Sequence, residues 1–362
     1  MLPNRRQKIL AAIVEQYIAT GEPVGSNALL SKLDISVSSA TIRNDMAVLT
    51  KLGYIYQPHT SAGRIPTQSG YRYYVDNLMQ VAELGESDRR RIEAGVDERS
   101  GDPEALLTKA GEALVDFTNY AAVATTPSDE HAVIKNVEIV PVSPRVAMIV
   151  LMTSTGILKS KACRADMELT PALLETCRST VAEAFVGKPL AEIGTVMIQT
   201  LVASLGAQAL TLSPLFSAIA DLAEEASQSQ VRLEGQSSLL GYREYADNLP
   251  ELLNFLHQSG PLGMLLSSGD PSSETGIEVR IGSENRYKEL SGSTTIISRY
   301  RIGDRATGAI GIIGPTRMDY SRLIPSIKYL SDIVSKTLSD VYEEDMLTDE
   351  RHKEEQEDGS GS

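Results

Sequence analysis

The stretch "LDISVSSATIRNDMAVLTKLG", residues 33 to 53, decides the fold of the N-terminal part of this chain. Ser38 or Ser39 offers the hydroxyl group that caps a helix, and Gly53 is the residue type that most often ends one. Because no Pro or Gly lies between them, we expect a helix that ends at Gly53. We expect a turn before it, around residues 34 to 37.

Two helices are predicted before this turn. Residues 5 to 19 carry apolar side chains at helical spacing, namely Ile9, Leu10, Ile13, Val14, Tyr17 and Ile18. Gly21 and Pro23 in "TGEPVGS" end this helix, and a short second helix runs from Ser26 to about Leu33. The order helix, short helix, turn, helix is that of a helix-turn-helix.

The third helix has two different faces. Ile42, Met46 and Leu49 form the stripe that packs on the first helix. The opposite side carries small and polar residues: Ala40, Arg43, Asn44, Ala47 and Lys51. Alanines let a helix approach DNA closely, Arg43 can reach guanine or a phosphate, and Asn44 can pair with adenine. The alternative is an ordinary solvated face of a small helical domain.

A β-hairpin is predicted directly after this helix. "YIYQ" (54–57) and "RIPT" (64–67) are β-prone segments that bracket "PHTSAG", as in the wing of a winged-helix domain. On such a wing Arg64 could enter a minor groove or contact phosphate. The loop residues His59, Thr60 and Ser61 could bond backbone oxygens. The alternative is a plain surface hairpin.

Charge is distributed unevenly along the chain. The formal net charge is -14, yet residues 1 to 80 carry a net +3, so the remaining 282 residues carry -17. Only the N-terminal part suits a polyanion, and a mildly basic solvated domain would explain the same excess.

Composition and motifs exclude several classes of protein. The 362 residues are 42% hydrophobic, which suits two or three globular domains. No secretion signal or membrane-spanning run is seen, so we expect a cytoplasmic protein. Cys163 and Cys177 lack metal-ligand or CxxC spacing, so we expect buried, reduced thiols. The four histidines lie in no catalytic motif: His59, His131, His257 and His352. We therefore expect no enzyme, no metal and no cofactor.

Several motifs together resemble a known family. "PVGS" (23–26), "SSATIRNDMAVL" (38–49), "GYIYQPHTSAGRIPT" (53–67) and "GYRYYVD" (70–76) are similar to the signature of the HrcA family, the bacterial heat-inducible transcription repressors. "GAIGIIGPTRMDYSR" (308–322) is similar to its C-terminal signature. One departure is Thr50 and Lys51, where members commonly carry an acidic residue, which would alter a local ion pair.

The resemblance implies a function and partners. It implies a homodimer that represses chaperone operons by binding an inverted-repeat double-stranded DNA operator and is released on heat stress, with a GroEL-type chaperonin keeping the repressor active. The DNA-binding residues expected from the face, the wing and the resemblance are Ser38, Ser39, Ala40, Thr41, Arg43, Asn44, Lys51, His59, Thr60, Ser61 and Arg64.

The resemblance also implies an α+β fold: an N-terminal winged helix-turn-helix domain, and a GAF-like α/β domain with an inserted helical dimerisation domain. We place the winged-helix domain at 1–80, a charged linker at 81–104, the GAF-like domain at 105–168 and 276–343, the insertion at 169–275 and an acidic tail at 344–362.

Patterning of the remaining chain is compatible with this plan. Strands at 137–142 and 145–152, helices over 171–225 and strands after 275 predict one sheet interrupted by a helical insertion. Helices are also expected at 244–258 and 321–341. The arginines at 89–91 could touch DNA, but acids on both sides favour a surface helix.

Two other functions fit the same sequence. One is a ligand-responsive transcription factor that uses the GAF-like domain as an effector sensor. The other is a protein-interaction adaptor whose winged helix binds no DNA. Electrophoretic mobility of chaperone-promoter DNA at graded salt would separate the adaptor from the repressor.

Overall fold

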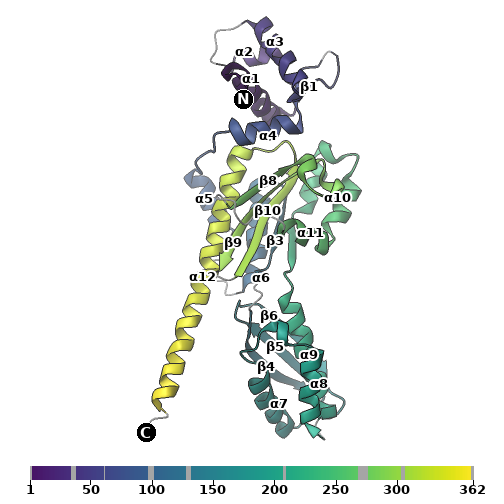
Figure 1. The fold of residues 1–362 in the computed structure, drawn as a ribbon, viewed down its shortest axis with the longest axis vertical. Helices are drawn as coiled ribbons and strands as arrows, with labels where there is room; N and C mark the ends of the chain where they lie inside the picture. The colour runs from purple at the N-terminus through teal and green to yellow at the C-terminus, as the bar shows by residue number, and fades with distance from the viewer. Residues whose placement is uncertain are drawn as a thin grey trace.

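The computed structural model describes residues 2–33, 38–60, 62–96, 102–127, 132–206, 209–267, 276–302 and 306–359. They form three units that follow one another along the molecule (Figure 1). We call them the head (residues 2–79), the central unit, built on a five-stranded sheet, and the insertion (residues 132–227), built on a three-stranded sheet. Helices and antiparallel strands in separate layers make this an α+β protein.

The head contains the predicted helices and hairpin. Its elements are α1 (Asn4–Thr20), α2 (Ser26–Leu30), α3 (Ser39–Lys51), β1 (Ile55–Tyr56), β2 (Ile65–Pro66) and α4 (Gln68–Asn77). The Ser38 side chain accepts a hydrogen bond from the Thr41 N–H, which fixes the start of α3 as its sequence predicted. Gly21, in the left-handed region, ends α1. The turn expected at 34–37 lies outside the described residues.

Helix α4 was not predicted from the sequence. The Thr67 hydroxyl caps it by accepting from the Gly70 N–H at 3.1 Å. A side chain at Gly70 would collide with the Tyr54 carbonyl oxygen, and one at Gly63 would collide with the Val24 backbone. These two glycines therefore allow the hairpin and α4 to pack directly on backbone.

The central unit has helices on both faces of its sheet. The strand order is β7 (Val231–Glu234), β3 (Ala121–Thr125), β10 (Ala306–Pro315), β9 (Ser293–Ile302) and β8 (Ile277–Ile281), all antiparallel. One face packs against α6 (Pro103–Thr118) and α12 (Tyr320–Gly359), in a core shared with the head. The other packs against α10 (Leu249–Leu256) and α11 (Ser259–Ser267). The helix α5 (Glu86–Glu93) lies against α12 and α6. Short 3-10 turns complete the unit: η3 (Gln236–Gly241), η4 (Arg243–Tyr245), η5 (Gly282–Glu284) and η6 (Lys288–Leu290).

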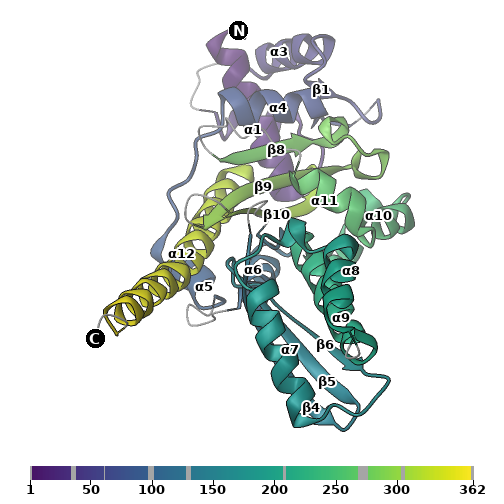
Figure 2. The same cartoon turned by 60° about the horizontal axis from the view of Figure 1, so that its bottom comes forward.

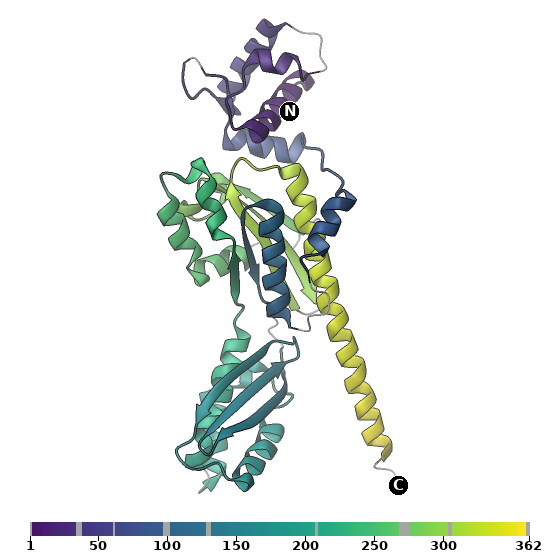
Figure 3. The same cartoon turned by 180° about the vertical axis from the view of Figure 1, so that it is seen from behind.

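The insertion is a separate layered unit with its own core. Its antiparallel strands β4 (Ile134–Ser143), β5 (Val146–Thr153) and β6 (Leu158–Arg164) are joined in sequence order. Its helical elements are α7 (Pro171–Ala184), η1 (Leu190–Glu192), α8 (Thr195–Ser204) and α9 (Ala209–Ser227). They lie on one side of the sheet, and Figure 3 shows the other side, which carries no helix.

The prediction of one interrupted sheet was wrong. The strands from 134 to 164 pair only with one another, so the insertion starts near residue 132 rather than 169 and ends near 227 rather than 275. The central sheet instead uses β3 and β7, which the sequence analysis missed. β3 is a short run of mostly alanines, buried along its whole length, so it shows no alternation.

Two predicted helices have different bounds. The helix expected at 244–258 is a 3-10 turn followed by α10, which carries Pro250 in its first turn. The last helix does not end at 341, because α12 continues to Gly359. Cys163 is half-buried, Cys177 is buried, and both are free thiols. No helix among the described residues is long and apolar enough to cross a membrane.

Candidate nucleic-acid interface

Helix α3 presents one polar stripe to solvent. Ile42 and Leu49 are completely buried beneath it, and Met46 is 5% exposed. The outer stripe is formed by the exposed residues Ala40, Arg43, Asn44, Ala47 and Lys51, as the sequence predicted. The serine cap adds to this stripe: Ser38 is exposed, and its hydroxyl lies 3.0 Å from that of the half-buried Thr41. Ser39 is half-buried in the first turn.

The loop between β1 and β2 projects beside this helix. His59 and Thr60 are exposed there, and Ser61 lies outside the described residues. The Gln57 side-chain amide donates to the carbonyls of Thr60 and Ala62, both at 2.9 Å. These two hydrogen bonds stabilise the conformation of the loop.

Arg64 lies at the base of the hairpin rather than at its tip. Its backbone N–H and carbonyl pair with Val24 at 2.8 and 2.9 Å. Its Nε donates to the Thr50 hydroxyl at 3.2 Å, and the residue is half-buried. Thr50 therefore occupies the position that faces Arg64, where the resemblance leads us to expect an acidic residue.

An ion cluster that was not predicted from the sequence joins the start of α1 to α3. The Asp45 side chain is only 4% exposed and accepts from Arg5 Nε at 2.6 Å and from Arg6 Nε at 2.9 Å. Hydrogen bonding from Arg5 lowers the pKa of Asp45, while burial opposes the shift. Asp45 lies at the edge of the buried stripe of α3, and a buried carboxylate needs a cationic partner. Its position in the sequence was therefore the signal that could have predicted this cluster.

The segment "GYRYYVD" (70–76), which lies in α4, faces the central unit. On α4, Tyr71 is buried against the ring of Tyr320, with centroids 6.1 Å apart. Arg72 binds Glu284 through a salt bridge and donates to the Val279 carbonyl. Helix α4 therefore docks the head and contributes no part of the exposed α3 stripe.

Arg317, from the C-terminal signature, makes a second connection. Its Nη1 donates to the Ile18 carbonyl at 3.0 Å, near the end of α1. Its Nε donates to Glu244 at 2.9 Å, in the central unit. The head is thus attached at both α1 and α4.

The arginines at 89–91 are engaged by nearby side chains. Arg89 lies over the Tyr329 ring at 5.7 Å, and Arg91 lies over Phe117 at 5.7 Å. Arg90 forms a salt bridge with Glu86 within α5. These contacts agree with the prediction of a surface helix, which was based on the acidic residues on both sides of the three arginines.

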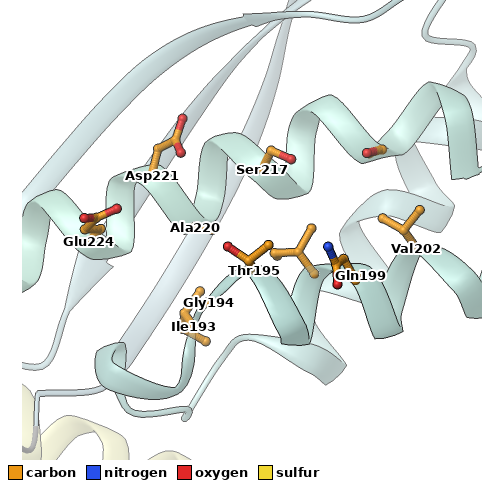
Figure 4. A pocket seen from close by; sticks show the side chains of 11 residues that line it. Ile193, Gly194, Thr195, Gln199, Val202, Ser217, Ala220, Asp221 and Glu224 are labelled. Carbon is orange, nitrogen blue, oxygen red and sulfur yellow. The ribbon is translucent and has the colours of Figure 1, made fainter.

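A pocket of about 370 Å³ lies in the insertion, between α8 and α9 (Figure 4). Thr195, Gln199 and Ser217 line it, together with the carboxylates of Asp221 and Glu224. Asp221 is paired with Lys161 at 2.7 Å. No cluster of side chains that could hold a metal ion is found among the described residues.

Comparisons with known proteins place the chain in a family. The family model "HrcA protein C terminal domain" matches residues 104–324. The heat-inducible transcription repressor HrcA of Acetivibrio thermocellus is 34% identical over 331 residues, 91% of this chain and 94% of that protein. That of Thermoanaerobacter pseudethanolicus is 34% identical over 350 residues, 95% and 99% of the two chains. A solved structure, "Crystal structure of a hypothetical protein at 2.2 A resolution", matches with a TM-score of 0.69 at 27% identity, over 94% of this chain and 100% of that one.

The chain has a small head with an exposed polar helix, joined to two further units. Its relatives are named as repressors, and together these findings define a transcription regulator. The chain belongs to the HrcA family of heat-inducible transcription repressors. It negatively regulates heat-shock transcription, and it is not an enzyme.

Proposed function

We propose that this chain represses chaperone operons by binding an inverted-repeat operator as a homodimer, with the head acting as a winged helix-turn-helix domain. The observation that supports it most directly is the exposed stripe of α3. Its two alanines leave room for close approach, while Arg43 and Asn44 supply the donors that read purines in a major groove.

The other expected contacts have distinct roles in this proposal. Ser38, Ser39 and Thr41 lie at the start of α3, where hydroxyls and backbone N–H groups bind phosphate. Lys51 lies at the far end of the same helix, and His59, Thr60 and Ser61 belong to the hairpin loop. Arg64 contributes from the hairpin base, where it can bind phosphate while its Nε stays on Thr50.

Replacement of single arginines tests the reading helix. We expect Arg43→Ala to cost about 1–3 kcal/mol of operator binding and to relax base preference, because a bidentate arginine discriminates between bases. Arg64→Ala should weaken binding to all sequences alike. The measurement is a mobility shift of chaperone-promoter DNA at graded salt, with Arg286→Gln in the central unit as the control. Unchanged operator affinity in both head variants would contradict this interface.

The homodimer is proposed to form through the uncovered face of the insertion sheet. Outward residues of adjacent strands are aligned by the register, which pairs Met148 with Val140 and Ala162, and Met152 with Leu158. Val140 is 49% exposed and Leu158 is 52% exposed, although both are apolar. Apolar side chains left open to water on one sheet face are typical of an association surface. A second copy satisfies the two-fold symmetry that an inverted repeat requires.

A matched pair of charged variants tests this surface. Val150 lies in the middle of the open sheet face, between Glu138 and Ser160, whereas Val196 lies on α8, on the helical side, and is 77% exposed. We expect Val150→Glu to give monomers in sedimentation with an unchanged circular dichroism spectrum. Val196→Glu should leave the dimer intact. The reverse result would move the interface to α8.

We propose that the central unit is the GAF-like domain and that the insertion is the dimerisation domain. The layered sheet with α6 and α12 on one face and α10 and α11 on the other supports the first assignment. The separate core of the insertion supports the second. We further propose that the repressor acts in the cytoplasm and that a GroEL-type chaperonin maintains its active form.

A further inference from the structure

Arg5 and Arg6 lie beside α3, and their shared partner Asp45 occupies only one edge of each guanidinium group. Each places its Nε against a different oxygen of Asp45, at 2.6 and 2.9 Å. Their side chains remain 47% and 30% exposed, while that of Asp45 is 4% exposed. In the part of the chain that the structure describes, no partner is found for their terminal nitrogens. Both guanidinium groups are therefore held at one edge and open at the other.

The position of this cluster matters for the face next to it. Asp45 directly follows Asn44 and lies one helical turn after Thr41, so the arginines flank the edge of the polar stripe. Figure 2 shows the start of α1 next to α3, at the end of the head that points away from the insertion. A duplex lying on the α3 stripe would bring one of its backbones to this edge.

The charge of the cluster exceeds what packing requires. One arginine would neutralise Asp45, and the second leaves a net positive charge. The first turn of α1 contains no acidic residue, and cations there oppose the helix dipole. Two adjacent arginines at this place thus carry a cost in α1 that the single Asp45 offsets only in part.

We propose that Arg5 and Arg6 bind the sugar-phosphate backbone beside the groove read by α3, and that Asp45 is a positioning residue that aims them. This assignment rests on the proposed operator binding by the head. The ligand chemistry is a pair of phosphates of double-stranded DNA. Asp45 itself touches no DNA, because its carboxylate is buried behind the two guanidinium groups.

The salt dependence of binding tests the two arginines. The probe is the duplex that the wild-type full-length chain selects from a randomised pool. We expect Arg5→Gln and Arg6→Gln each to lower the slope of log affinity against log salt by about 1, with base preference unchanged. Arg286→Gln, which removes an exposed charge from the central unit, should leave the slope unchanged.

The Asp45→Asn variant tests the positioning role. This variant removes the one negative charge of the cluster, so affinity for a scrambled duplex should rise. Affinity for the selected duplex should fall, because the arginines are no longer held in position. A purely structural role would lower both affinities together, in step with the folded fraction. Asp45→Glu should restore part of the discrimination.

The possible outcomes separate this inference from the proposed function. If Arg43→Ala weakens binding but neither arginine variant changes the salt slope of folded protein, the arginines are structural and the inference fails. If the wild-type chain selects no duplex, the operator binding itself fails.

Discussion

At the scale of single residues, the signature segments of this chain contain two kinds of side chain. Some face solvent, and others hold the head together. Arg43 and Asn44 are exposed, whereas Asp45, their neighbour in the sequence, is buried and ion-paired. The helical repeat predicted the first two, because it depends only on spacing. It could not predict the partners of Asp45, because they come from another helix.

The ion cluster predicts a dependence of stability on pH. Hydrogen bonding from Arg5 makes the folded-state pKa of Asp45 lower than its unfolded value, which is about 3.9. The carboxylate therefore stabilises the fold at pH values above the unfolded pKa, and this contribution is lost as the pH falls through the folded pKa. Asp45→Asn should lower the free energy of unfolding by about 1–3 kcal/mol near neutral pH. The difference between the unfolding free energies of wild type and variant should become smaller at acid pH.

Urea unfolding over a pH series measures this difference. Asp332→Asn is the control, because its pair with Lys328 lies on an exposed helical surface, where ion pairs contribute about 0–1 kcal/mol. A constant difference between wild type and Asp45→Asn down to acid pH would show that the carboxylate charge is not what stabilises α3.

At the scale of elements, the sequence predicted those with strong local signals. Helices α1, α2 and α3, the hairpin and strands β4 and β5 were predicted from apolar spacing, caps and turn residues. β3, β7 and α4 were missed: the two strands are short and depend on partners distant in the sequence, and α4 follows directly after a strand. The exposed polar stripe of α3 was predicted because it depends on spacing within one helix. The docking of α4 was not predicted, because it depends on residues of the central unit that are distant in the sequence.

The docking of α4 predicts an energetic coupling between the head and the central unit. Arg72 and Glu284 are each about 30% exposed, and their salt bridge joins α4 to η5. We expect a coupling of about 0.5–1 kcal/mol in a double-mutant cycle of Arg72→Ala and Glu284→Ala, measured by urea unfolding. The pair Arg90 and Glu86, exposed within α5, is the control and should couple more weakly. Additive effects of the two replacements would mean that the apolar core shared by the two units holds the head without this bridge.

At the scale of the whole molecule, the fold depends on contacts between distant parts of the chain. β3 pairs with β10, so that Ala124 lies opposite Ile310, and the entire insertion is placed between them in the sequence. The core of the head also continues into α12, near the other end of the chain. None of these contacts can form until nearly the whole chain is available, which favours slow folding.

This topology predicts a protein that refolds poorly without assistance. Before β10 is in place, β3 lacks the strand it pairs with, and the core between the sheet and helices α6 and α12 is incomplete. Apolar surface left exposed in this way promotes aggregation. We therefore expect mild heating to abolish operator binding irreversibly through aggregation. We expect a GroEL-type chaperonin with ATP to raise the recovered active fraction, and chaperonin without ATP to raise it less. The active fraction is measured by titrating the refolded protein against operator DNA. Complete recovery without chaperonin would contradict the proposal that a chaperonin maintains the active form. Heat would then act on the repressor reversibly and directly, and the distant pairing of β3 with β10 would impose no practical barrier to refolding.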